Sequence, residues 1–234
     1  MGDDLVLEVK SAKTNRVIIH SNSMEKTDAG LIGELIVSYV EHESSDLDSY
    51  IEDLVKNFSN RLSLPNSVFF RGADISVKDK LTSDQVGPSP CPKDGRYNKS
   101  GEKCIYLSDT IDFLYSELNA TELLLQRYVI PLDGLRIADL SPNNKNLCNS
   151  LALAFDMAER GMTASGYGFE KELEERGKSR YLVSQLLSFL FNKYGWDGIY
   201  IPGVHGEQGR HYHNLAISGT IVDEWKSWAN GSYF

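Results

Sequence analysis

Runs of alternating apolar and polar residues recur along this chain, and they are interleaved with longer runs in which apolar residues return every three or four positions. The first pattern is typical of strands and the second of amphipathic helices. These short runs predict strands at residues 5–10, 16–20, 67–71, 103–107, 126–132, 135–140, 198–202 and 213–218. Asp133 and Gly134 predict a turn between two of the strands.

The helical period predicts helices at residues 28–43, 46–62, 146–160 and 179–194, a helix that begins near residue 110, and a short amphipathic turn at 223–228. The helix at 179–194 has the clearest pattern, because its apolar residues share one face and Gly195 follows as a terminator. Several neighbouring strands among helices, without a regular strand–helix–strand repeat, predict an α+β fold with a mixed sheet flanked by helices.

A break at Leu64-Pro65-Asn66 divides the chain into two parts. Residues 1–65 are expected to form an N-terminal extension, made of a hairpin and helices. Residues 66–234 are expected to form a larger domain that holds the functional site. A chain of 234 residues is long enough for one large domain with such an extension.

The charge of the chain limits its partners. The net charge is −9 and the isoelectric point is about 5.1. An acidic protein repels the phosphate backbone, so we expect no general nucleic-acid binding. A local group of arginines can still hold one small phosphorylated ligand.

Cysteine usage and hydropathy favour a cytoplasmic protein. The three cysteines, Cys91, Cys104 and Cys148, are odd in number and widely spaced, which favours free thiols in a reducing compartment. The N-terminal residues have no signal-peptide pattern, and no apolar run approaches the roughly 20 residues of a membrane span. We therefore expect no membrane association.

The segment from residue 95 to 118, GRYNKSGEKCIYLSDTIDFLYSEL, concentrates the candidate chemistry. It predicts a polar loop, a strand containing Tyr106, and a helix that Ser108 or Asp109 would cap. On that helix Glu117 lies beside the expected buried stripe of Ile111, Leu114, Tyr115 and Leu118. The alternative is that Glu117 is a solvated flank and Tyr106 a core residue.

Two arginines can supply positive charge to a ligand. Arg71 ends an apolar strand, so its guanidinium projects from a rigid element. Arg96 follows Gly95, which allows a phosphate to approach the backbone closely. A surface ion pair for Arg71 and a solvated loop position for Arg96 are the alternatives.

Other catalytic and metal motifs have little support. His205, His211 and His213 lie close together and Glu207 is a weak fourth ligand, but surface or rim imidazoles are the favoured interpretation, so we expect no metal. The sequence contains no GxGxxG, P-loop or GxSxG motif.

The ordered motifs between residues 68 and 218 resemble the RES-domain family, the toxin half of bacterial RES–Xre toxin–antitoxin pairs. The matching motifs are FFRGA with Arg71, GRYN with Arg96, Tyr97 and Asn98, IYLS with Tyr106, FLYSEL with Glu117, and HYHNLAI with Asn214. The helix and strand SQLLSFLFNKYGWDGIYIPG match the approach to the last motif. Gly203 stands where the family has serine, and His205 stands at the basic position that follows.

The resemblance implies an ADP-ribosyltransferase-like fold and cleavage of the nicotinamide–ribose bond of NAD+, which is a substrate here and not a cofactor. It implies catalytic roles for Glu117, Arg71 and Tyr106. It implies NAD+ contacts for Arg71, Arg96, Tyr97, Asn98, Tyr106, Gly203, His205 and Asn214. The implied reaction is hydrolysis or phosphorolysis, without a metal, and the implied partners are an antitoxin or immunity protein, or a second copy of the chain. A protein-directed ADP-ribosyltransferase and a non-catalytic nucleotide-binding module, which Gly203 favours, remain alternatives.

Overall fold

The computed structural model describes residues 7–9, 17–19, 49, 52–53, 55–64, 67–75, 86–89, 92–141, 181–203 and 212–233. Of residues 7–9, 17–19, 116–117, 182–183 and 231–233 it describes the backbone alone. The helices predicted at 28–43 and 146–160 lie outside these ranges, as do Cys91, Cys148, His205 and His211.

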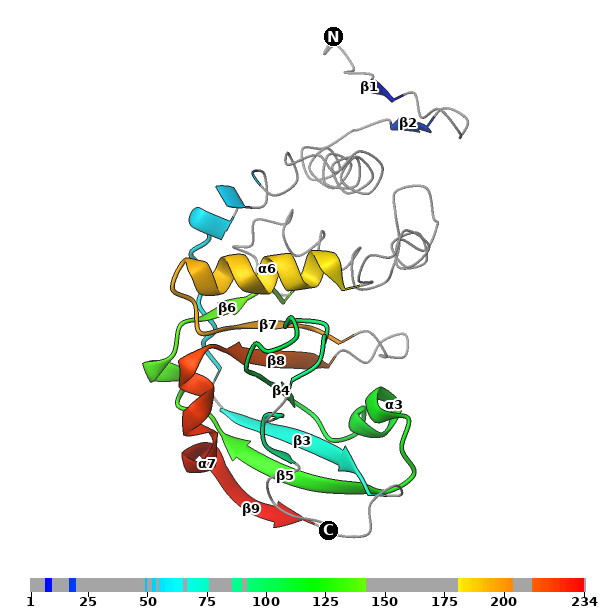
Figure 1. Ribbon diagram of the computed structural model, residues 1–234, viewed down its shortest axis with the longest axis vertical. Helices are drawn as coiled ribbons and strands as arrows, with labels where there is room; N and C mark the ends of the chain where they lie inside the picture. The colour runs from blue at the N-terminus through cyan, green and yellow to red at the C-terminus, as the bar shows by residue number, and fades with distance from the viewer. Residues whose placement is uncertain are drawn as a thin grey trace.

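A sheet of seven strands forms the centre of the protein (Figure 1). Its order is β6 (Ile137–Asp139), β7 (Gly198–Pro202), β8 (His213–Ser218), β4 (Cys104–Ser108), β3 (Val68–Asp74), β5 (Leu123–Val129) and β9 (Ala229–Tyr233). The β6–β7 pair is parallel and the other pairs are antiparallel, which confirms the predicted mixed α+β sheet. The predicted N-terminal hairpin is also confirmed, as β1 (Leu7–Val9) and β2 (Val17–Ile19).

The sheet consists of two halves that meet at a narrow junction. Strands β3 and β5 pair along seven residues, and β4 and β8 pair along five. In contrast, β3 and β4 pair at one position, Phe70 opposite Ser108. The sheet therefore opens between β3 and β4, and side chains can enter the gap.

One face of both halves contributes to a common hydrophobic core. Phe69 of β3, Leu107 of β4 and Tyr200 of β7 all lie in it, and the rings of Phe69 and Tyr200 meet edge to face at 6.3 Å. Val222 of η3 (Thr220–Glu224) and Trp228 of α7 (Trp225–Trp228) also belong to this core. Full burial of one such side chain contributes on the order of 2 kcal/mol, so these contacts hold the two halves together.

Helix α6 (Leu182–Lys193) lies alongside β6 and β7 (Figure 1). Its buried Phe191 meets Phe58 and Trp196 edge to face, with ring centroids 5.2 and 5.9 Å away. Gly195 follows the helix with a positive φ of 77°, as the sequence predicted for its terminator. Of the helices that the structure describes, none combines the length and apolar character needed to cross a bilayer.

Two strand predictions need correction. The turn predicted at Asp133-Gly134 exists as η2 (Leu132–Gly134), but β5 and β6 lie far apart in the sheet order and do not form a hairpin. Strand β5 ends at Val129 and not at residue 132, because Pro131 has no N–H to offer a ladder. Strand β9 was not predicted.

Residues 60–62 bind the larger part of the protein. Arg61 donates hydrogen bonds to the carbonyls of Leu132, Asp133 and Leu135, and the Leu62 amide donates to Ile137 at 2.8 Å. The side chain of Leu62 lies in the common core. The domain boundary expected at residue 65 stays a prediction.

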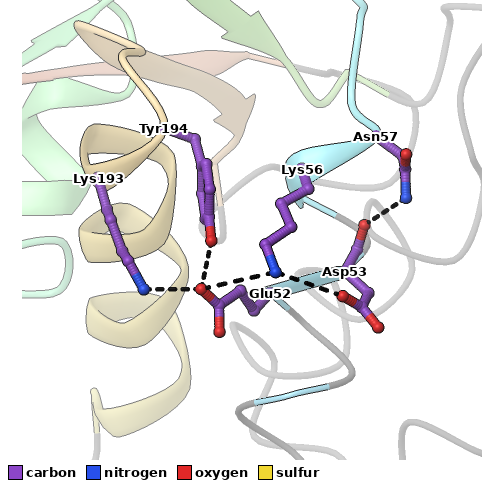
Figure 2. Close-up of polar contacts among 6 residues, drawn as sticks. All are labelled: Glu52, Asp53, Lys56, Asn57, Lys193 and Tyr194. Atoms are coloured by element: carbon purple, nitrogen blue, oxygen red, sulfur yellow. Dashed lines mark hydrogen bonds and ion pairs between the residues drawn. The ribbon is translucent and has the colours of Figure 1, made fainter.

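A carboxylate attaches the segment before these residues to the end of α6 (Figure 2). Glu52 accepts hydrogen bonds from Lys193, at 2.7 Å, and from the Tyr194 hydroxyl, and Lys56 lies 3.9 Å away. Hydrogen bonds from Lys193 and Tyr194 lower the pKa of Glu52 from its ordinary value of 4.5 to about 2. The bonded state therefore favours the ionised carboxylate.

This arrangement predicts an acid-sensitive contribution to stability. Because the folded-state pKa is lowered, the contribution is present above pH 4.5 and is lost as the pH falls toward 2. Glu52→Gln should lower the melting temperature at pH 7, and the difference from wild type should shrink below pH 4.5. Asp53→Asn is the control, because Asp53 is exposed and contacts Lys56 but not Lys193 (Figure 2). An equal Glu52→Gln effect at pH 3 and pH 7 would contradict the assignment.

Candidate functional site

The loop at Gly95–Asn98 is a tight turn in which the Gly95 amide donates to the Asn98 carbonyl at 2.9 Å. A side chain at position 95 has no room, because its Cβ would lie 2.6 Å from Asn98 Oδ1 and 2.7 Å from the Tyr106 hydroxyl. Glycine is therefore required for the loop to close on β4.

The Tyr106 hydroxyl fixes this loop from the sheet side. It accepts the Tyr97 amide at 2.9 Å and donates to Asn98 Oδ1. Burial raises the pKa of Tyr106 well above its ordinary value, while the nearby charge of Arg96 acts in the opposite direction. The phenol is thus neutral and can donate and accept at the same time.

Helix α6 fixes the loop from the other side. Gln185 Nε2 donates to the carbonyls of Gly95, at 2.8 Å, and Asn98, at 3.1 Å. Ser184 donates to the Arg96 carbonyl at 2.6 Å. The loop is therefore held between β4 and α6, and Gln185 and Ser184 are site residues that sequence reasoning missed. The signal was a pair of adjacent polar residues near the start of a largely apolar helix.

Three loop residues predicted to contact NAD+ also take part in this packing. Tyr97 is 2% exposed and its ring centroid lies 5.5 Å from that of Tyr106. Asn98 donates to the carbonyls of Lys93 and Lys99. The Arg96 guanidinium lies over the ring of Tyr181 at 5.8 Å. Their roles toward a ligand stay predictions.

Arg71 enters the gap between β3 and β4. Its Nη1 donates a long hydrogen bond of 3.4 Å to the Tyr106 carbonyl. Burial lowers the pKa of Arg71, and the neighbouring Tyr128, Cys104 and Tyr106 raise it. In the part of the chain that the structure describes, no carboxylate lies within ion-pair distance of this guanidinium. A partly buried cation with no paired anion among the described residues can bind an anionic ligand.

Cys104 faces this group as a buried free thiol, as predicted for it from the sequence. Burial raises the pKa of Cys104 to about 12, partly offset by the charge of Arg71. The thiol is therefore protonated at neutral pH and is a poor nucleophile.

The helix that contains Glu117 is shorter than predicted. Helix α3 spans Leu114–Leu118. Two of its residues, Tyr115 and Leu118, are 42% and 40% exposed. These two residues were predicted to be buried, and that prediction is wrong. Of Leu114, Tyr115 and Leu118, Leu114 alone is buried, because a helix of five residues has a short buried face. The Glu117 side chain lies outside the described residues. The helix itself lies against β3, where Leu118 Cδ1 is 3.0 Å from the position of a Cβ on Gly72, next to Arg71.

Helix α3 begins at Leu114, so both predicted caps are wrong: Ser108 does not cap it, and neither does Asp109. Its carboxylate accepts the His213 amide at 2.9 Å, His213 Nδ1 at 3.1 Å and the Tyr200 hydroxyl at 2.9 Å. Ser108 Oγ instead accepts the Thr110 amide at 3.3 Å. His213 is buried and not a surface imidazole. The sequence could not reveal this cluster, since it depends on the order of strands in the sheet.

Gly203 has a packing reason to be glycine. Its Cβ would lie 2.0 Å from the ring of Tyr212, which is itself stacked on Phe113 at 4.4 Å and 12°. The Gly203 amide donates to the Tyr212 carbonyl at 2.8 Å. Tyr212 therefore occupies the space that a side chain at position 203 needs. Asn214, two residues after Tyr212, is buried opposite Ser108 of β4.

A metal site remains untested. Among the residues that the structure describes, no group of three histidine, cysteine or acidic side chains could hold a metal ion. His205 and His211 lie outside those residues.

No protein-family model matches the sequence, and no curated protein matches it. Among solved structures, the chain is similar to one in the crystal structure of the M. tuberculosis MbcT–MbcA toxin–antitoxin complex, with a TM-score of 0.44 and 13% identity. The match covers 78% of this chain and 90% of that chain.

The contact at Gly203 predicts that serine at this position destabilises the protein. Gly203→Ser forces the Tyr212 ring to move, which should lower the free energy of unfolding by about 1–3 kcal/mol. Chemical denaturation monitored by circular dichroism measures this change. Gly134→Ser is the matched control, because nothing lies within 4 Å of a Cβ at that position. Equal free energies of unfolding for the two variants would mean that the Tyr212 ring can move aside at no cost, which would contradict the prediction.

Proposed function

We propose that this chain is a toxin-like enzyme that degrades NAD+ by cleaving the nicotinamide–ribose bond, with water or phosphate as the acceptor. The observation that carries the proposal is the partly buried guanidinium of Arg71 at the junction of β3 and β4, without a carboxylate partner in the described part of the chain. The motifs that resemble the RES-domain family are the support for NAD+ as the nucleotide.

A diphosphate is the ligand group that suits this arginine. Its two negative charges offset the cost of burying the guanidinium, and the planar fork can bind phosphate oxygens bidentately. Arg96 lies close enough to Tyr106 for its charge to affect the pKa of that phenol. Arg71 binds the Tyr106 carbonyl and Arg96 lies near the Tyr106 phenol, and we propose that each guanidinium binds one of the two phosphates.

The fixed loop supports binding of a flat ring. Tyr97 and Tyr106 are held by hydrogen bonds from β4 and α6, so they lose little further entropy when a ligand binds. The partly exposed ring of Tyr106 can pack beside nicotinamide, whereas the ring of Tyr97 is buried and supports that of Tyr106.

The proposed chemistry assigns Glu117 to the ribose. As the bond from C1′ to the pyridinium nitrogen breaks, nicotinamide leaves as a neutral molecule and the ribose becomes oxocarbenium-like. A nearby carboxylate stabilises this positive charge. Helix α3 holds the Glu117 backbone next to β3, one strand from Tyr106.

The wider proposals follow from the motifs. The opened sheet is the proposed ADP-ribosyltransferase-like core, and the proposed setting is the cytoplasm. The proposed partner is an antitoxin or immunity protein, with self-association as a further option. One observation favours a second function: the tight Gly203–Tyr212 contact leaves position 203 without a hydroxyl, as in a nucleotide-binding module that does not cleave NAD+.

An assay of NAD+ with and without phosphate tests the proposal. Wild type should release nicotinamide, and the second product should be ADP-ribose if water is the acceptor or ADP-ribose 1″-phosphate if phosphate is. Glu117→Ala should lose at least about 100-fold in rate, because a charge at the transition state is removed. Glu122→Ala, an exposed carboxylate nearby in sequence, is the control. Intact NAD+ with wild type would favour the binding module, and ADP-ribose attached to protein would favour the transferase.

Arg71→Lys tests the role of the guanidinium. The charge stays but the planar fork is lost, so kcat/KM for NAD+ should fall about tenfold or more. Arg127→Lys, on the neighbouring β5, is the control for a general effect of replacing arginine. Wild-type kcat/KM in Arg71→Lys would remove Arg71 from the site.

A further inference from the structure

Asp109, which follows β4, His213 at the start of β8 and Tyr200 in the middle of β7 form a polar cluster across three neighbouring strands. The Asp109 carboxylate accepts three hydrogen bonds, two of them from His213 and one from Tyr200. The imidazole stacks on the Tyr200 ring at 4.7 Å and 20°. The cluster is thus rigid, and neither the sequence motifs nor the proposed binding of NAD+ gives it a role.

The carboxylate determines which imidazole nitrogen holds the proton. Asp109 Oδ2 can only accept, so His213 Nδ1 must carry the hydrogen that lies between them. In the neutral ring, Nε2 is then an acceptor with a free lone pair. An aspartate that orients a histidine in this way prepares Nε2 to take a proton.

Nε2 of His213 is buried and has no hydrogen-bond partner among the residues that the structure describes. Leaving a buried polar atom unsatisfied costs about 1–3 kcal/mol, and native proteins keep few such atoms. His213 as a whole is 9% exposed, so bulk water does not satisfy it. A hydrogen-bond donor that binds during the reaction, such as a water molecule, would satisfy Nε2.

The cluster lies beside the proposed NAD+ site. Phe69 and Arg71 are two residues apart on β3 and share a face, and the Phe69 ring contacts that of Tyr200. Phe69 therefore lies between Arg71 on its own strand and Tyr200, whose ring stacks on that of His213. The Asp109 side chain is 26% exposed, so water reaches the edge of the cluster.

We infer that His213, oriented by Asp109, is the general base that activates water for the cleavage of NAD+. This inference rests on the proposed function and specifies its acceptor. One O–H bond of water breaks and its proton moves to Nε2. The water oxygen forms the bond to C1′ while the C1′–nitrogen bond breaks. The electron pair of the broken bond leaves with neutral nicotinamide. The imidazolium then releases the proton to solvent, so the products are ADP-ribose, nicotinamide and a proton.

His213→Asn is the test variant, because the asparagine amide can still donate to Asp109 while Nε2 is gone. Hydrolysis of NAD+ should fall by about 100-fold to 10,000-fold, as expected for loss of a general base. Azide needs no deprotonation, so adding it should restore NAD+ consumption and give azido-ADP-ribose, detected by mass spectrometry. Wild type should gain little from azide.

The outcomes distinguish the role of His213 as a base from the proposed cleavage of NAD+ itself. Undiminished hydrolysis by His213→Asn, or a loss that azide does not restore, would overturn the role of His213 while the proposed function stands. Intact NAD+ with wild type, with or without azide, would overturn both. Nitrogen-15 NMR of histidine-labelled wild type gives a test without catalysis. The signal that His213→Asn removes should show the proton on Nδ1, and a proton on Nε2 would overturn the inference.

Discussion

A positive charge held inside an opened sheet is the constraint on which the rest of this structure depends. Strands β3 and β4 meet at Phe70 and Ser108 and then separate, and Arg71 fills the gap with a hydrogen bond to the Tyr106 carbonyl. The cost of burying this guanidinium is offset in part by peptide and phenol dipoles. The proposed anionic ligand would complete the compensation, so the proposed site and a constraint on stability share one location.

Strand β4 organises both sides of that location. Ile105 and Leu107 lie in the core that joins the two half-sheets, while Tyr106 turns the other way and fixes the Gly95–Asn98 loop. Directly after the strand, Asp109 binds His213 across the end of β8. One short strand thus connects the core, the loop and the buried imidazole, and a shift of its register would disturb all three.

The sequence was most informative where local signals agree with the final packing. Strands β7 and β8 and helix α6 were predicted closely, because their apolar patterns are strong. In addition, Gly195 follows the end of α6 and Gly203 follows the end of β7. Strand β9, with the sequence ANGSY, was missed because it lacks alternation and forms by pairing with β5. The Asp109 and Gly203 contacts come from segments distant in sequence, so no local pattern predicts them. The side chain of Glu117 stays a sequence-based assignment.

The order of strands also has a kinetic consequence. Asp109 and His213, which meet at the β4–β8 pair, are 104 positions apart, and the parallel β6–β7 pair also needs a long crossover. Closing such long loops costs chain entropy before any contact compensates for it, so pairing of this kind forms slowly. Until β8 arrives, the edge of β4 is open to other chains. The newly made protein therefore passes through a period in which association with a chaperone competes with aggregation.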